Sequence, residues 1–222
     1  VPAHAAVNTS VELVYQRKQE PYKKLINAVL RRLSREGKNL VNEQDDAKLN
    51  TADWLWESWT TAFGQKTCRK IAEAHLCQAP LDLTVKCDAI GWARRLSGQL
   101  LNTGSIRLFD HDAIDALHGY NEGAWWVQDA AAALPVKLLG DIKGLRIADL
   151  CAAPGGKTAQ LAAAGAEVFA IDRSANRLTR LNQNLTRLNL EAQTIVADAI
   201  TWRPETLLDA VLIDAPCTAT GT

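Results

Sequence analysis

The sequence of 222 residues contains no methionine and no apolar run of about 18 residues. Its first thirty positions also lack the charged and then apolar pattern of a secretory signal. We therefore expect a protein of the cytoplasm that has no membrane partner. Because position 1 is valine and Pro216–Thr222 resembles a loop, we also expect that both ends are cut from a longer chain.

Paired metal or disulfide signals are missing as well. The five cysteines are widely spaced, form no C-x-x-C pair and have no histidine beside them at metal-ligand spacing. We therefore expect neither a disulfide framework nor a bound metal.

The formal net charge is zero, so the charge of the whole molecule does not indicate a nucleic-acid partner. The charge is unevenly distributed, however, because residues 17–38 hold eight basic side chains and only two acidic ones. This basic segment fits either an RNA-binding face or a solvated helix face.

The first forty residues have helical periodicity. Val7, Val11 and Val14 predict a helix over about 4–17, and Pro21 is well placed to open a second helix. We expect Gly37 to end that helix. Residues 41–122 then mix an acidic connector, a tryptophan-rich helix ending near Phe63 and a small α/β segment.

From residue 146 the pattern changes to short apolar runs that alternate with helices, which is typical of a parallel sheet. The predicted strands are Arg146–Leu150, Glu167–Ile171, Gln193–Val196 and Ala210–Ile213. The predicted helices cover 157–164 and about 174–189, and an alanine-rich helix before the sheet is expected to end near Gly140. The fold class is therefore α/β, with a doubly wound sheet.

The first predicted strand runs directly into a turn of small residues, Cys151–Thr158. Ligands of open α/β sheets bind at the carboxyl ends of strands, and adjacent glycines allow backbone N–H groups to approach them. A P-loop is disfavoured because Cys151 stands where its first glycine belongs, and a dinucleotide fingerprint is disfavoured because only the pair Gly155-Gly156 is present.

Aspartates follow the next three strands at Asp172, Asp198 and Asp214. Carboxyl-terminal acids of successive parallel strands lie along one rim of a sheet, and Asp172 is spaced to accept hydrogen bonds from a ribose. The glycine turn and these acids together predict a nucleotide-like ligand site.

These motifs resemble the RNA cytosine-C5 methyltransferases. The similarity lies in Asp149–Thr158, Asp172–Ser174, Asp198 and Asp214–Cys217. Residues 27–33 and 126–129 resemble the Sun/Fmu group of bacterial small-subunit rRNA methyltransferases, in which a NusB-like helical RNA-binding domain precedes the catalytic domain. The resemblance implies an end of a NusB-like domain at 1–40, a connecting subdomain at 41–122 and a Rossmann-like methyltransferase sheet, strands one to four, at 123–222.

The resemblance also implies the site. S-adenosylmethionine would be bound by Cys151, Ala152, Ala153, Pro154, Gly155, Gly156, Lys157, Asp172, Arg177, Asp198 and Asp214. Cys217 would be the catalytic cysteine that assists product release, and the partner would be small-subunit rRNA, bound by a monomer. Residues 218–221 depart from the serine-glycine pair that is common after this cysteine.

Catalysis in this family requires a thiolate that adds to C6 of cytosine and so activates C5. That cysteine belongs to a later T-C motif in the family, so we expect this chain alone to be an inactive fragment. Two alternatives stay open, namely an RNA-binding module that only retains the methyltransferase scaffold, and a nucleotide-dependent NTPase.

Overall fold

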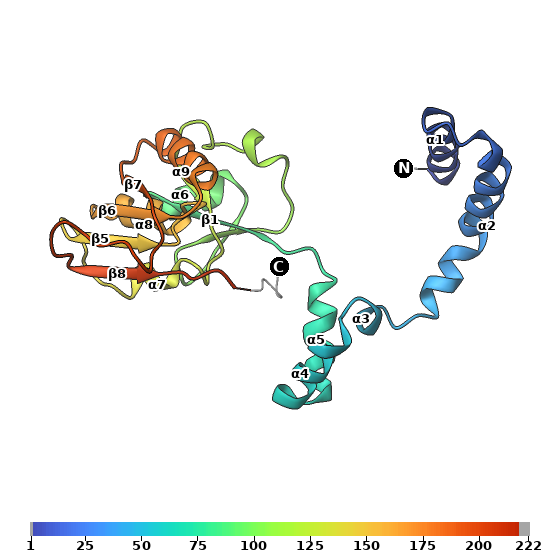
Figure 1. Cartoon of the computed structure of the whole chain (residues 1–222), viewed down its shortest axis with the longest axis horizontal. Helices are drawn as coiled ribbons and strands as arrows, with labels where there is room; N and C mark the ends of the chain where they lie inside the picture. The colour runs from blue at the N-terminus through green and yellow to red at the C-terminus, as the bar shows by residue number, and fades with distance from the viewer. Residues whose placement is uncertain (1, 218–222) are drawn as a thin grey trace. The chain divides into compact units, whose positions relative to one another are not determined.

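A computed structural model describes residues 2–217, which form two compact units that divide between Gln78 and Ala79 (Figure 1). The predicted domain boundaries at 40/41 and 122/123 fall inside these units and stay a proposal. Within residues 2–217, no helix combines the length and apolar content that crossing a bilayer requires.

The first unit is helical. Its elements are α1 (Ala3–Gln16), a 3₁₀ turn (Glu20–Tyr22), α2 (Lys23–Asn42), α3 (Asp46–Leu49), α4 (Asp53–Phe63) and α5 (Gln65–His75). Helix α1 lies against α2, with Val7 and Val14 buried (Figure 1). The prediction that Gly37 ends α2 is wrong, because a single glycine costs a helix only about 1 kcal/mol and good helix formers surround it.

The second unit begins with an antiparallel sheet in the order β2-β3-β1-β4. Its elements are β1 (Leu81–Val85), α6 (Ala89–Arg95), β2 (Gln99–Leu100), β3 (Ile106–Leu108), a 3₁₀ turn (Ile114–Ala116) and β4 (Trp125–Val127). Asp82 is buried and accepts from Nε and Nη2 of Arg107 at 2.7 and 2.8 Å, and from the Ala130 N–H at 3.0 Å. The guanidinium lowers the pKa of Asp82, and the ion pair joins β1 to β3. The hydrogen bond from Ala130 joins the sheet to the segment after β4.

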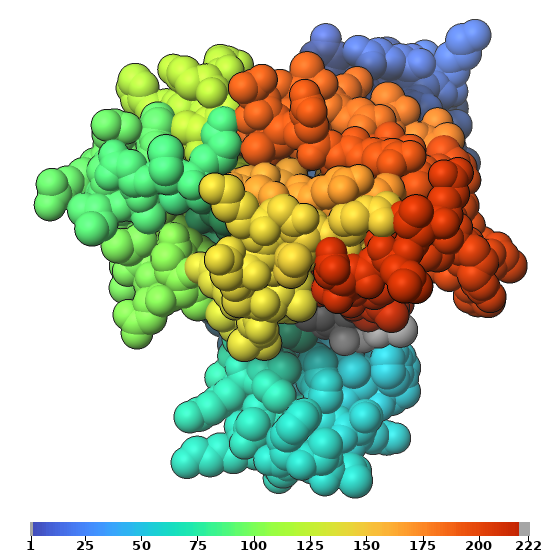
Figure 2. All heavy atoms as spheres, turned by 90° about the vertical axis from the view of Figure 1, so that its left-hand side faces the viewer, coloured from blue at the N-terminus to red at the C-terminus, as the bar shows by residue number. Residues whose placement is uncertain are grey.

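A parallel sheet follows in the order β7-β6-β5-β8. Its elements are β5 (Arg146–Leu150), α8 (Gly156–Ala163), β6 (Glu167–Asp172), α9 (Ala175–Leu188), β7 (Gln193–Val196) and β8 (Ala210–Ile213). The predicted strands and the buried leucine stripe of α9 are confirmed. Figure 2 shows the residues around β5 in yellow beside those around β8 in red.

The prediction of an alanine-rich helix that ends near Gly140 is wrong. The structure has turns there and a short helix, α7 (Leu134–Lys137). Pro135 explains this difference, because proline cannot donate within a helix and disfavours helical geometry in the residue before it.

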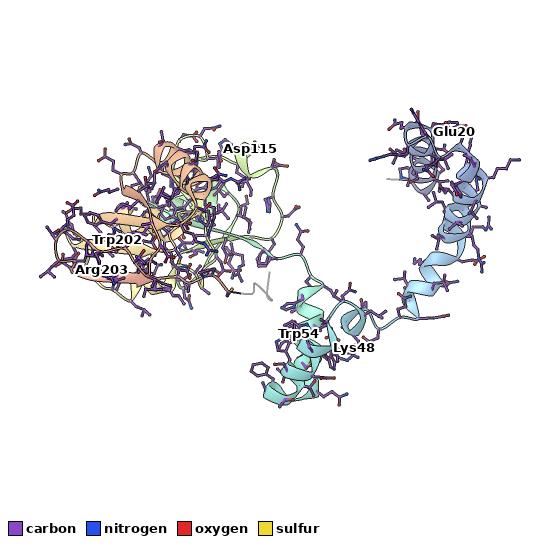
Figure 3. The ribbon with its side chains drawn as sticks, viewed as in Figure 1. Glu20, Lys48, Trp54, Asp115, Trp202 and Arg203 are labelled. Carbon is purple, nitrogen blue, oxygen red and sulfur yellow. The ribbon has the colours of Figure 1, made fainter. Side chains whose placement is uncertain are left out.

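The two faces of the parallel sheet differ. Helices α8 and α9 cover one face through apolar side chains such as Leu161 and Leu181. The other face contains a hollow of about 440 Å³, lined by sheet residues and by the loop that carries Trp202 and Arg203 (Figure 3). On β8, Val211 is 50% exposed and Ile213 is 66% exposed. An apolar part of this face is therefore open in the described chain.

Candidate active site

The turn after β5 has a constrained backbone. Cys151 and Gly155 both have positive φ angles, 62° and 105°, and the Ala153–Pro154 peptide bond is cis. No side chain fits at Gly155, because a Cβ there would lie 2.7 Å from Cγ of Leu181 on α9. The turn then delivers Gly156 to the first position of α8, where backbone N–H groups have no partner within the helix.

Asp172, at the end of β6, forms hydrogen bonds with the turn after β5 and with the residues that precede α9. Its carboxylate accepts from the Ala153 N–H at 3.2 Å and from the Ser174 N–H at 2.9 Å, and only 3% of the residue is exposed. The guanidinium of Arg177 lies 3.4 Å from the same carboxylate and also donates to the Ala153 carbonyl. Arg177 and the Ala153 N–H therefore share Oδ2 of Asp172.

Lys157 connects the glycine turn to the end of β8. Its Nζ lies 2.6 Å from Oδ2 of Asp214, and the lysine side chain is only 12% exposed. The Asp214 N–H donates to the Leu150 carbonyl at 3.3 Å. The first residue of the segment Asp214–Cys217 is thus fixed against the turn that follows β5.

Asp149 is a buried acid that was not among the predicted cofactor-binding residues. Its Oδ2 accepts from Oγ1 of Thr158 at 2.6 Å, while its Oδ1 has no hydrogen-bond partner among residues 2–217. Burial raises the pKa of Asp149 to about 6, against the opposing effect of the Thr158 hydrogen bond. An acid with this pKa in a cleft is a sign of a functional site.

A cavity of about 230 Å³ lies at the carboxyl end of β5. Its lining includes most of the predicted turn and also Asp149, Gln128 and Asp129; the full set is Val127, Gln128, Asp129, Ala132, Asp149, Cys151, Ala152, Ala153, Pro154, Gly156, Lys157 and Asp214. The cavity wall therefore carries three aspartates and one lysine.

Four of the predicted cofactor-binding residues do not line this cavity, and neither does Cys217. Gly155 packs against Leu181 behind the turn, and Asp172 and Arg177 lie at the end of β6 and the start of α9. Asp198 is exposed, and its carboxylate accepts from the Ile200 N–H at 2.9 Å. The predicted residues are therefore divided between the cavity at β5 and β8 and separate positions behind the glycine turn, at the end of β6 and after β7.

Gln128 belongs to a buried hydrogen-bond network that sequence reasoning missed. Its Oε1 accepts from the Trp126 indole N–H at 3.0 Å, and its Nε2 donates to Oε1 of Gln160 at 3.0 Å. Gln160 in turn donates to the Ala133 carbonyl at 2.9 Å. The motif Trp126–Asp129 was part of the resemblance, but no sequence signal paired Gln128 with Gln160, which is 32 positions away.

Cys217, three residues after Asp214, is exposed and ends the described chain. The sequence difference at residues 218–221, where a serine-glycine pair is common after the cysteine, lies outside the described residues.

The fold and the site define a class, the Rossmann-like α/β proteins with a cavity at the carboxyl ends of parallel strands. The chain is similar to the crystal structure of a methyltransferase homologue from Pyrococcus horikoshii, with 24% identity and a TM-score of 0.65 over 77% of this chain and 61% of that one. It is also similar to NSun6 from Pyrococcus horikoshii with SFG, with 17% identity and a TM-score of 0.62 over 75% of this chain and 71% of that one. These similarities concern the fold.

Sequence comparison gives more specific similarities. Residues 137–222 match the family model described as 16S rRNA methyltransferase RsmB/F, and residues 1–35 match the NusB family. The whole chain is 36% identical to the ribosomal RNA small subunit methyltransferase B of Cronobacter sakazakii and spans 55% of that relative. Residues 137–222 are thus similar to the RsmB/F methyltransferases, and the chain spans about half the length of the curated relatives it matches.

Proposed function

We propose that this chain supplies the cofactor-binding half of an S-adenosylmethionine-dependent methyltransferase that modifies C5 of a cytosine in small-subunit rRNA in the cytoplasm. One observation carries the proposal. The 2.6 Å ion pair between Lys157 and Asp214 fixes the start of the segment Asp214–Cys217 beside the glycine turn. The match of residues 137–222 to the RsmB/F family model and the similarity in fold support it.

The residues present fit S-adenosylmethionine. This cofactor has a positive sulfonium and a positive ammonium, and the cavity wall offers Asp129, Asp149 and Asp214 to such charges. The unpartnered Oδ1 of Asp149 is a buried acceptor that an ammonium group would satisfy. Lys157 and the start of α8 suit the cofactor's carboxylate, and Asp172 suits its ribose.

Bound S-adenosylmethionine supplies an electrophilic methyl group. The chain's own residues would hold and orient it, since the turn Cys151–Gly156 and Lys157 lie on one side of the cavity and Asp214 on another. By family resemblance, we propose that Cys217 assists release of the methylated base. The 222 residues contain no later T-C motif, so we propose that they bind cofactor without transferring its methyl group.

Calorimetry with Asp172→Asn and Asp172→Ala tests the cofactor site. We expect either change to weaken S-adenosylmethionine binding about tenfold or more, because hydrogen bonds to a charged group contribute about 1.5–3 kcal/mol each. The Ala153 and Ser174 N–H groups bind different oxygens of Asp172, so asparagine keeps one of these two hydrogen bonds and alanine keeps neither. Comparison of the two variants therefore shows how far loss of the turn's hydrogen bonds adds to loss of charge.

Asp141→Asn, on an exposed loop outside the cavity lining, is the control and should bind cofactor like the parent chain. Unchanged affinity in both Asp172 variants would remove Asp172 from the site. A chain that binds RNA but not S-adenosylmethionine would favour the RNA-binding module, and one that binds ATP instead would favour the NTPase.

A further inference from the structure

Asp129 lines the cavity at the carboxyl end of β5 from a segment that belongs to neither sheet. This segment follows β4, and the Asp129 residue is exposed. Its Oδ1 accepts from the N–H groups of Ala131 and Ala132 at 2.8 and 3.2 Å. Its Oδ2 accepts no hydrogen bond from residues 2–217, so this oxygen is available to a ligand in the cavity.

Both neighbours of Asp129 are held by one residue of β1. The Gln128 N–H donates to the Asp82 carbonyl at 3.0 Å, and the Ala130 N–H donates to Oδ2 of the Asp82 carboxylate at 3.0 Å. The backbone and the side chain of Asp82 thus bind the residues before and after Asp129. These two hydrogen bonds restrict the backbone of Asp129 and with it the direction of its carboxylate.

The Asp82 carboxylate is itself fixed by Arg107. The two residues are direct cross-strand partners on β1 and β3, and the guanidinium donates to both carboxylate oxygens, at 2.7 and 2.8 Å. The Asp82 side chain is only 2% exposed, and the planar fork of arginine fixes its orientation as well as its position. A chain of contacts therefore runs from the antiparallel sheet through Asp82 to the cavity wall.

Stability of the antiparallel sheet alone does not account for this ion pair. Leu83 and Ile106 belong to the apolar core of the sheet, and Asp82 lies on the opposite face of β1 because side chains alternate along a strand. A buried ion pair stabilises a protein no more than apolar residues of similar volume commonly do. What the pair adds here is a fixed acceptor for the Ala130 N–H.

We propose that Asp82 and Arg107 are positioning residues for the cofactor, because they orient Asp129 toward its positive amino group. This inference rests on the proposed function for the identity of the ligand. A carboxylate and an ammonium form a charge-assisted hydrogen bond, and a carboxylate that is already oriented loses less freedom on binding. The antiparallel sheet lies outside residues 137–222, which match the methyltransferase family model, and it thereby takes part in the cofactor site.

Calorimetry with the 222-residue chain tests this role with two ligands. These are S-adenosylmethionine and 5′-methylthioadenosine, which keeps the adenosine part but has neither the sulfonium nor the amino group. Asp82→Ala should weaken S-adenosylmethionine about tenfold, the size of one hydrogen bond to a charged group, and change methylthioadenosine by less than about twofold. In an Asp129→Asn background, Asp82→Ala should weaken S-adenosylmethionine by less than about twofold, because the two residues act through one interaction.

Thr84→Val is the matched control. Thr84 is a buried polar residue on the same face of β1, and its Oγ1 has no hydrogen-bond partner among residues 2–217. Valine should leave the affinities of both ligands unchanged. Arg107→Gln is a milder second variant for the case in which Asp82→Ala does not fold by circular dichroism. It leaves Asp82 to the Ala130 N–H but removes the fork, so it should weaken S-adenosylmethionine about threefold and spare methylthioadenosine.

Amide hydrogen exchange gives a readout that needs no cofactor. The N–H groups of residues 128–132 should exchange about tenfold faster in Asp82→Ala than in Thr84→Val. Equal weakening of both ligands would mean a general loss of cavity structure and would overturn the positioning role, as would unchanged S-adenosylmethionine affinity or unchanged exchange. If the parent chain bound neither ligand, the proposed function would be refuted, and the exchange result would separately decide whether Asp82 fixes the segment of Asp129.

Discussion

Burial of the Asp149 side chain lowers the stability of the folded chain at neutral pH. A buried carboxylate whose pKa is raised from 3.8 to about 6 keeps its proton in the folded chain after the unfolded chain has lost it. The folded chain then binds more protons between about pH 4 and 6, so stability falls as pH rises through this window. The loss amounts to about 3 kcal/mol at pH 7.

We predict that Asp149→Asn removes this loss. Asparagine can still accept from Thr158, but it carries no charge to bury. In urea unfolding, the free energy of unfolding of the variant relative to the parent chain should rise by about 3 kcal/mol between pH 4 and pH 7. Thr158→Val should have the opposite effect, because it removes the hydrogen bond that lowers the pKa of Asp149. A pH-independent difference for Asp149→Asn would mean that this carboxyl titrates normally.

Asp172 and Arg177 show how far sequence predicts single residues. The position of Asp172 after a strand and beyond a glycine turn predicted an acid at the carboxyl rim of the sheet, and the structure places it there. The pattern could not predict that Arg177 covers this acid, because one side chain's rotamer depends on a carbonyl 24 positions earlier. The site roles of both residues stay predictions.

At the scale of elements, the glycine turn depends on close packing against α9. We predict that Gly155→Ala destabilises the second unit by about 2–4 kcal/mol, because alanine is strained at a φ of 105° and its Cβ would meet Leu181 at 2.7 Å. Thermal and urea unfolding would measure the change.

Gly156→Ala is the matched control at the next position. Its Cβ would meet Gln128 at 3.6 Å, an ordinary contact, and its φ is not positive. Alanine should be neutral there or stabilise the start of α8 by up to about 1 kcal/mol. Similar losses at both glycines would show that crowding of the whole turn, and not Gly155 itself, limits stability.

The elements that the sequence predicts correctly are those determined by a local pattern of residues. The four parallel strands are short apolar runs bounded by turns, so local pattern determines them and the prediction was confirmed. The predictions at Gly37 and before Gly140 were wrong because helix formation there depends on opposing local preferences. Gly37 disfavours a helix by only about 1 kcal/mol, so α2 continues through it, whereas a proline disfavours a helix interior by about 3 kcal/mol, so the alanine-rich helix does not form. The Asp82–Arg107 ion pair links residues 25 apart in sequence and has no local signature.

At the scale of the whole molecule, the role of Cys217 can be tested only in a protein that continues through the T-C motif. We predict that a protein which continues through the family's T-C motif methylates 16S rRNA, and that the 222-residue chain does not. In the longer protein, Cys217→Ala should accumulate a covalent RNA adduct, visible as a gel shift that survives denaturant, because addition to cytosine occurs and elimination stalls.

Cys217→Ser in the longer protein is the conservative comparison and should show the same adduct if the thiol itself is needed for release. Methyl transfer by the 222-residue chain alone, abolished by Cys217→Ala without an adduct, would make Cys217 the nucleophile. That outcome would reverse the assigned role and leave the cofactor site intact.

The strand order also has a consequence for the growing chain on the ribosome. Strand β5 is made before its neighbours, and its two flanks are filled at different times, because β6 begins 17 residues after β5 ends and β8 begins 60 residues after it. At a synthesis rate of about 5–20 residues per second, one edge of the central strand waits about 3–12 seconds for its partner. During this interval an apolar strand edge is available to other nascent chains, so the timing of translation becomes part of how this sheet avoids aggregation.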